Sequence, residues 1–461
     1  MAADKTPRDD DVEDVKDDGG AVNESLQADT RLVELLQSGD LSEAVMEKFQ
    51  TMIEPFQEQG QLLDPLLRDM VTPVVRRIQS VFSSMASTSP SSAFPFQVLD
   101  AATRIHLHRA CQILYLLCKV RGYVKAPHIL SILMGLVTRY KTIVKLMPHD
   151  VAEFEPVLLL LQSQDRDDFS TWEIRFVLLL WLSILALVPF DLKSIDSSLD
   201  GHEEHGESIA IVADIVAISK TYLQDSGPTQ QAAALCLARL LSRPDMEDQY
   251  LVAFLDYVKV ELNAFCTASH AADSSQARIR QYKITAGIML CLSYICKFTP
   301  RDKHIVLMGE YFGHVMHVID AIRAQDAAMV VSSTVHRKLS TKLLQRMGLL
   351  YLPPKVMTWR YARGVRSLAA NLAAAPHPVA DASAANDKTS NPFENDVPAE
   401  LEQVVDVLLC GLKDRDTVVR WSAAKGVGRV TSRLPFEFAD DIVHAVLELF
   451  SANESDGSGN Y

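Results

Sequence analysis

The residues with the most obvious capacity for chemistry are His202 and His205, which flank two glutamates in the run His202-Glu-Glu-His205. Imidazole nitrogens and carboxylate oxygens bind zinc, and a zinc-bound water would make a metal-dependent hydrolase. The run is not the HExxH pattern of zinc proteases, and no third ligand accompanies it. We interpret it as a solvated polar loop. A zinc hydrolase stays an alternative that requires a closed ligand set.

Other catalytic patterns are absent from the sequence. There is no Gly-x-Ser-x-Gly elbow, no Cys/His constellation and no GxxxxGK[ST] phosphate loop. Gly426-Val-Gly428 falls inside a predicted helix, so we interpret it as a close-packing pair. His314 and His317 share a helical face and are interpreted as packed or half-exposed surface residues. The sequence therefore predicts a protein that is not itself an enzyme, with no catalytic residue, no cofactor and no metal site.

A basic cluster is the strongest candidate for binding a partner. Arg360, Arg363 and Arg366 recur every three residues beside Trp359, which places the arginines on neighbouring positions of one helix. Four further basic residues precede them: Arg337, Lys338, Lys342 and Arg346. A positive stripe in an acidic protein would attract an acidic partner. The alternative is an ordinary solvated helix face.

Helices must position these side chains, because helical periodicity runs through almost the whole chain and strand signals are nearly absent. The predicted helices include 246–266 and, around the arginines, 355–373. The clearest unit comprises an amphipathic helix over 399–412 and a second helix over 416–434. Asp416 is of the right type to cap the second helix. Val419, Ala423, Val427 and Val430 form its apolar face, and we expect Arg420 with Asp416 to bridge adjacent repeats.

This helix hairpin has the character of a HEAT-type repeat. Its small residues, Ala423, Ala424, Gly426 and Gly428, would let a second helix approach closely. Such a unit cannot bury both faces alone and stacks on neighbours. The predicted fold is all-α, a HEAT/armadillo-like α-solenoid of stacked antiparallel helix pairs. Proteins of this class usually hold other proteins.

Composition limits the remaining function classes. The chain has 461 residues, is 48% hydrophobic and carries a formal net charge of −14, which argues against nucleic acid as a partner. The seven cysteines form no CxxC and are predicted to be reduced core residues. An apolar run over 176–190 is too short for a bilayer and is predicted to be a central buried helix, so no transmembrane segment is expected.

Changes in composition predict five regions. These are a disordered acidic tail (1–25), an N-terminal helical-repeat solenoid (26–372) with an apparent insertion (124–140), a disordered loop (373–398), a HEAT-like repeat with the start of the next (399–450), and a disordered tail (451–461). The last predicted helix, over 436–450, has no partner helix after it. We therefore expect a truncated product with an exposed apolar face.

Several long runs resemble the tubulin-folding cofactor D (tubulin-specific chaperone D) family. The resemblance rests on residues 412–426 and 354–372, and it continues through 148–157, 172–182 and 188–191. It covers most of the chain apart from the two tails and the loop at 373–398. In the family, the Val-Arg-Gly-Tyr run that ends here at Tyr123 leads directly into the segment that begins here at Lys141. That departure marks the apparent insertion.

The resemblance implies a function that periodicity and composition do not. Members of the family capture β-tubulin, join it to α-tubulin with the partner cofactors C and E, and bind an Arf-like small GTPase. The assembled complex stimulates GTP hydrolysis by tubulin. The resemblance also implies a cytoplasmic protein associated with the cytoskeleton, the centrosome and lateral membrane junctions. A generic HEAT-repeat scaffold without tubulin specificity is the alternative.

Overall fold

The computed structural model describes residues 30–57, 60–86, 100–120, 140–189, 192, 210–268, 275–299, 301–327, 333–353 and 397–455. Every regular element in these ranges is a helix, as predicted. The chain divides into two compact units, one formed by residues 1–125 with 137–148 and the other by 126–136 with 149–461.

The first unit is built around α5 (Ala101–Val120), which packs on α2 (Glu43–Ile53), α3 (Leu67–Ala86) and α7 (Tyr140–Val144). A helix over 30–37 precedes them, and the short 3-10 helices η1 (Glu54–Gln57) and η2 (Gly60–Leu63) connect α2 to α3. Two arginines hold the segment that connects the helix over 30–37 to α2. Arg77 donates to the carbonyl of Leu36 and Arg109 to that of Leu41, each at 2.7 Å.

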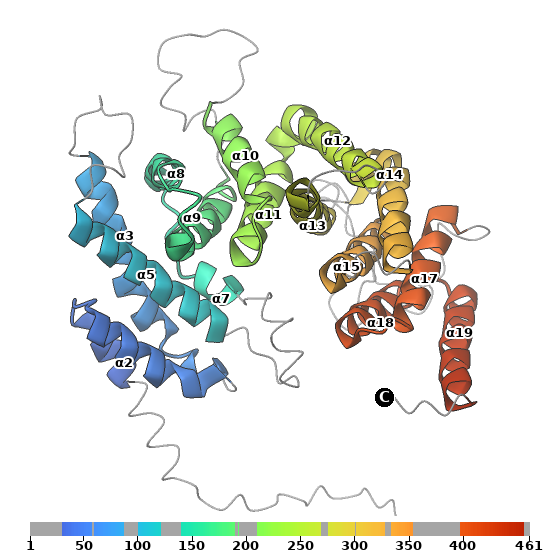
Figure 1. Cartoon of the computed structure of the whole chain (residues 1–461), viewed down its shortest axis with the longest axis horizontal. Helices are drawn as coiled ribbons and strands as arrows, with labels where there is room; N and C mark the ends of the chain where they lie inside the picture. Colours follow the sequence, from blue (N-terminus) through green and yellow to red (C-terminus); the bar gives the residue numbers. More distant parts are fainter. Residues whose placement is uncertain are drawn as a thin grey trace, which may run out of the picture. The chain divides into compact units, whose positions relative to one another are not determined.

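The second unit is a series of helix pairs, shown from green to red in Figure 1. We call the first helix of each pair A and the second B. The A helices are α8 (Phe154–Gln162), α10 (Ala210–Tyr222), α12 (Val252–Ala268), α14 (Arg301–Ala327) and α17 (Ala399–Leu412). The B helices are α9 (Trp172–Leu185), α11 (Pro228–Leu241), α13 (Ser275–Phe298), α15 (Thr334–Tyr351) and α18 (Thr417–Thr431). The short 3-10 helix η3 (Val151–Glu153) precedes α8, and η4 (Phe169–Thr171), η7 (Pro244–Met246) and the π-helical η8 (Glu247–Leu251) lie between later helices of the series.

Stacking of the B helices holds the second unit together. α9 packs on α11, α11 on α13, α13 on α15 and α15 on α18, and each A helix packs on the B helix of its own pair. This is the predicted α-solenoid. A final helix, α19 (Phe436–Ser455), follows α18 and continues beyond the predicted end at 450.

α9 is the apolar helix that the sequence predicts to be central. All its residues from Ile174 to Leu185 are buried, including Trp181. Two polar side chains in that stretch bond locally, since Arg175 donates through Nη1 and Nη2 to the carbonyls of Asp165 and Asp168, and Ser183 donates to that of Leu180. No helix in the described ranges is both long and apolar enough to cross a membrane.

Two expectations need correction. Six cysteines are buried as predicted, but Cys410 on α17 is exposed. The helix predicted over 246–266 begins later, because η7 and η8 occupy residues 244–251 before α12 starts at Val252. The predicted helix over 355–373, the insertion at 124–140 apart from Tyr140, and the acidic tail lie outside the described residues.

Candidate protein-interaction surface

The B helices are held in register by side chains that reach from one pair to the next. Gln230 on α11 donates to the carbonyl of Leu223 at 2.8 Å and to that of Lys283 on α13 at 2.7 Å. Arg239 on α11 donates to the hydroxyl of Ser183 on α9 at 3.0 Å. Arg346 on α15 repeats this contact with the carbonyl and hydroxyl of Ser293 on α13. These bonds tie the B helices α11, α13 and α15 each to the one before it.

Two joints between pairs also contain an arginine–aspartate ion pair. Asp225 lies two residues before Gly227, the N-cap of α11, and accepts two hydrogen bonds from Arg166 of the preceding pair. Asp414 lies two residues before Asp416, the N-cap of α18, and Arg337 on α15 binds it with Nε 2.8 Å from Oδ2. A carboxylate at this position therefore meets a cation from the previous pair at both joints.

Asp416 caps α18 as the sequence predicts. Its Oδ1 accepts the amide of Val418 at 3.0 Å, and its Oδ2 accepts the hydroxyl of Thr334 on α15 at 2.6 Å. Burial acts to raise the pKa of Asp416. The hydrogen bonds from Thr334 and Val418 and the positive charges of Arg337 and Arg420 outweigh burial, so the pKa lies below its ordinary value.

The predicted bridging role of Arg420 is wrong. Its guanidinium donates to the carbonyl of Asp414 and the hydroxyl of Thr417, both at 2.8 Å and both within its own pair. Asp416 does reach the preceding pair through Thr334, and the ion pair across the joint is made by Arg337 and Asp414. Arg337 and Arg420 hold equivalent positions, because Ser333-Thr-Val-His-Arg337 and Asp416-Thr-Val-Val-Arg420 share a cap, a Thr-Val pair and an arginine, but this pattern does not pair Arg337 with Asp414.

The small residues of α18 divide between two faces. Ala423 and Gly426 are buried, and a Cβ added at Gly426 would lie 2.8 Å from Cδ2 of Leu408 on α17, so they allow the close approach that was predicted. Ala424 and Gly428 are exposed, and nothing lies within 4 Å of a Cβ added at Gly428. Val419 and Val430 are buried, as the predicted apolar face requires.

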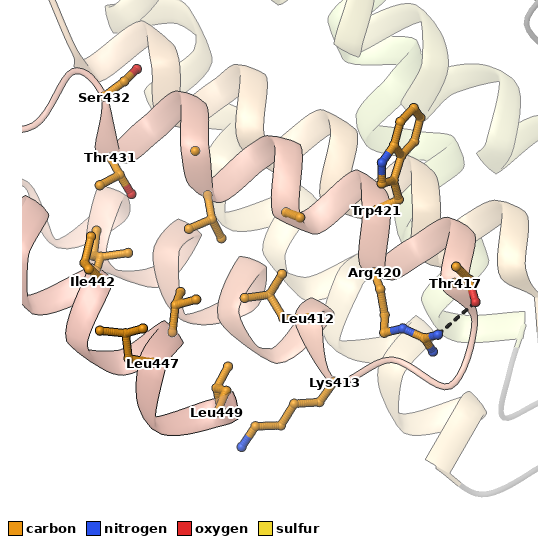
Figure 2. Close-up of a pocket in the computed structure, with 15 residues that line it drawn as sticks. Leu412, Lys413, Thr417, Arg420, Trp421, Thr431, Ser432, Ile442, Leu447 and Leu449 are labelled. Carbon is orange, nitrogen blue, oxygen red and sulfur yellow. Dashed lines mark hydrogen bonds between the residues drawn. The ribbon is translucent and has the colours of Figure 1, made fainter. Parts of the chain in front are cut away.

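An apolar groove of about 710 Å³ lies along that second face, between α18 and α19. Figure 2 shows Leu412 and Lys413 at one end, close to Leu449, and Thr431 and Ser432 at the other. Its walls are made by side chains of α18 and α19, among them Trp421, Val427, Ile442, Val443, Val446 and Leu447. Trp421 is 42% exposed and Leu447 is 54% exposed, which is unusual for large apolar residues facing a shared hollow.

A second hollow of about 700 Å³ lies where α9 and α11 end, beside Phe298 of α13. Arg243 donates to the carbonyls of Ala186 at 3.0 Å and Val188 at 2.8 Å, and it pairs with Asp245 at 2.7 Å. A cation at the end of α9 matches the negative end of the helix dipole. We assign this cluster a structural role.

The four basic residues that precede the predicted arginine stripe are used inside the unit. Arg337 binds Asp414, and burial lowers the pKa of Lys338. Lys342 and Arg346 lie over the ring of Tyr294, at 4.8 and 5.4 Å from its centroid. They do not extend a free positive face. Arg360, Arg363, Arg366 and Trp359 lie outside the described residues, so their role stays a prediction.

The candidate metal and nucleophile residues form no site in the part of the chain that the structure describes. No group of three or more His, Cys, Asp or Glu side chains there is arranged to hold a metal, and His202 and His205 fall outside those ranges. On α14, His314 is half-buried beside Tyr311 and His317 is exposed. Burial raises the pKa of Cys118, Cys236 and Cys296 to about 12, so these thiols are poor nucleophiles.

Comparisons with known proteins match most of the chain. A family model described as "Tubulin-specific chaperone D-like, ARM repeat" matches residues 53–131 and 124–262, and a second, "Tubulin-specific chaperone D-like, ARM repeats", matches 335–460. The tubulin-folding cofactor D of Schizosaccharomyces pombe is 29% identical over 342 residues, which cover 74% of this chain and 25% of that protein. The tubulin-specific chaperone D of Dictyostelium discoideum is 22% identical over an alignment of 484 positions, which covers 87% of this chain and 31% of that protein.

The chain thus spans about a quarter to a third of the length of these relatives. The two family models together reach across both compact units. The stacked A and B helices of the second unit are the architecture that the word ARM denotes. The chain belongs to the tubulin-specific chaperone D-like family of ARM-repeat proteins.

Proposed function

We propose that this chain is a tubulin-folding chaperone that binds β-tubulin and takes part in assembling the α/β-tubulin heterodimer. The family assignment and the names of the two relatives carry the proposal. The helical stack adds a physical reason. An α-solenoid presents an extended surface on which a protein subunit can be held, which a small enzyme cleft cannot do.

The finer proposal concerns the partners. The chain works with the tubulin-folding cofactors C and E and an Arf-like small GTPase, and the complex stimulates GTP hydrolysis by tubulin. The chain is not catalytic in this proposal, so nucleotide turnover takes place on a bound partner whose site the complex shapes. We place this activity in the cytoplasm and at the cytoskeleton, the centrosome and cell junctions.

The contact with tubulin is proposed to include Arg360, Arg363 and Arg366 beside Trp359. Guanidinium groups bind carboxylates through paired hydrogen bonds, and a positive stripe would speed the approach of an acidic partner. The neighbouring Lys342 and Arg346 are stacked on Tyr294, so they are poor candidates for the same contact.

The test is co-purification of the 461-residue chain with β-tubulin, by size exclusion at two salt concentrations. A stoichiometric complex that weakens at higher salt supports the proposal, because screening shortens the reach of exposed charges. A variant with Arg360, Arg363 and Arg366 changed to glutamine separates the stripe from the rest of the surface. Recovery of other proteins without β-tubulin would favour a generic HEAT-repeat scaffold.

A further inference from the structure

Lys220, in the last turn of α10, places an amine in the joint between two A helices. Its Nζ lies 4.6 Å from the centroid of the Tyr257 ring and 5.9 Å from that of the Phe254 ring, and both rings belong to α12. Phe254 is fully buried and Lys220 is half-buried. The amine therefore lies against aromatic carbon with only part of its surface in water.

The neighbouring carboxylates of α10 and α12 bond to other helices. Asp214 on α10 accepts the side-chain amide of Gln162 on α8 at 2.9 Å. Asp256 on α12 accepts the hydroxyl of Tyr311 on α14 at 3.4 Å. In the ranges that the structure describes, the amine of Lys220 makes no hydrogen bond and no ion pair. Its interactions there are those with the two rings.

A half-buried ammonium without a counter-ion is destabilised relative to the free amine. Burial lowers the pKa of Lys220 below its ordinary value. The rings attract the ammonium, but this attraction is small beside the hydration that burial removes. A larger share of this side chain is therefore unprotonated at neutral pH than in an exposed lysine, and an unprotonated amine is a nucleophile.

The surroundings of the amine also favour one class of electrophile. An aldehyde would give a Schiff base, which is still positively charged when it is protonated. An acyl donor gives a neutral amide, so acylation removes the charge that the joint disfavours. The planar amide can lie on the rings of Tyr257 and Phe254, where the ammonium now lies.

We propose that Lys220 is a site of acylation by acyl thioesters, set by its place over the rings of α12 and by the lack of a neighbouring carboxylate. The nitrogen lone pair attacks the thioester carbonyl, a C–N bond forms and the C–S bond breaks. The thiolate leaves and takes up, through water, the proton that the nitrogen releases. The products are a neutral amide and a free thiol. The proposal does not rest on tubulin as a partner.

The test is incubation of the full 461-residue chain with acetyl-coenzyme A at pH 7.5, with the acetylation rate of each lysine followed by peptide mass spectrometry. We expect Lys220 to react about threefold faster than Lys259, which is exposed on α12. The difference should disappear in the urea-unfolded chain, because the joint is lost. A folded-state rate at Lys220 no higher than that at Lys259 would overturn the proposal. So would a preference for Lys220 that persists in urea.

A supplied counter-ion tests the cause. Ala217 is exposed on α10, three residues before Lys220, so a side chain at this position neighbours the amine on the helix surface. Ala217→Glu should slow acetylation of Lys220 about twofold by stabilising the ammonium. Ala217→Gln has the same size without the charge and is the matched control, which should react as the parent chain does. Equal rates at Lys220 in the two variants would contradict the role of the missing carboxylate.

Discussion

The guanidinium of Arg337 meets the carboxylate of Asp414 at 2.8 Å across the joint between α15 and α18, and the two side chains are only 7% and 13% exposed. Both charges are largely removed from water, so loss of either side chain would leave the other charge buried without a partner. Asp414 also accepts the amide of Asp416 at 2.8 Å, so the pair is tied to the start of α18. The ion pair therefore links the stacking of two repeats to the capping of one helix.

Removal of one partner of this pair should destabilise the joint strongly. We expect Asp414→Asn or Arg337→Met to lower the local free energy of unfolding by about 3 kcal/mol, because a buried charge is left unpaired. Hydrogen exchange of the α17 and α18 amides measures this, since repeats open individually. The double variant should lose less than the sum of the single changes, and strict additivity would contradict the coupling.

The stability that Asp416 contributes as the N-cap of α18 should be lost at acid pH. Asp416→Ala should lower the stability of α18 by about 1 kcal/mol because the bond to Val418 is lost. The pKa of Asp416 is lowered in the folded state, so its ionised form stabilises the fold above the ordinary carboxyl pKa. That contribution is lost as the pH falls through the lowered pKa, below about 4. Asp416→Asn keeps an acceptor without a titrating charge, and an unchanged acid profile in this variant would argue against Asp416.

His336 should make the joint between α13 and α15 sensitive to mildly acidic pH. Its Nε2 donates to the carbonyl of Tyr282 at 2.9 Å, Nδ1 lies 2.6 Å from Oγ of Ser333, and burial lowers its pKa to about 4. The unfolded chain takes up this proton near pH 6.5 and the folded chain does not, so stability falls as the pH drops between these values.

Between pH 7.5 and pH 5, the loss from His336 should be about 2 kcal/mol. Urea unfolding followed by the near-ultraviolet signal at the two pH values measures it. His336→Gln should be less stable at pH 7.5 but should show a smaller difference between the two conditions. The same difference in both chains would assign the effect to other groups.

Alanine substitutions at two glycines should change stability in opposite directions, which tests how the helices pack. A Cβ at Gly287 on α13 would lie 2.5 Å from the carbonyl oxygen of Leu223, which also accepts from Gln230. Backbone cannot yield easily there, so Gly287→Ala should destabilise the second unit by about 2 kcal/mol. Gly428→Ala meets open space and should stabilise α18 by up to about 1 kcal/mol. The melting temperatures of the two variants test this. Equal changes in melting temperature would contradict the close packing at Gly287 and the open space at Gly428.

Local signals in the sequence were enough for individual helices. The bounds of α17 were predicted as 399–412, and Asp416 was identified as the cap of α18, because caps and apolar periodicity act within one turn. The start of α12 was missed, since Pro244 begins a 3-10 turn that leads into a π-helical turn before Val252.

Contacts between repeats could not be predicted from the sequence. Arg337 and Asp414 are 77 residues apart, and nothing local pairs them. Lys342 and Arg346 have the composition of a solvated face, yet the ring of Tyr294 on α13 lies against them. Which face of α15 is covered depends on its neighbour, and the same reason explains the exposure of Cys410 on α17.

The burial of α9 on every side has a consequence for synthesis of the chain. α8 precedes α9 and covers one side, but α11 ends only at Leu241 and covers another. Residues 172–185 are synthesised before α11, so the apolar face of α9 that packs on α11 is exposed to water until α11 has been made. The nascent chain should therefore itself need a holding chaperone until α11 has been translated.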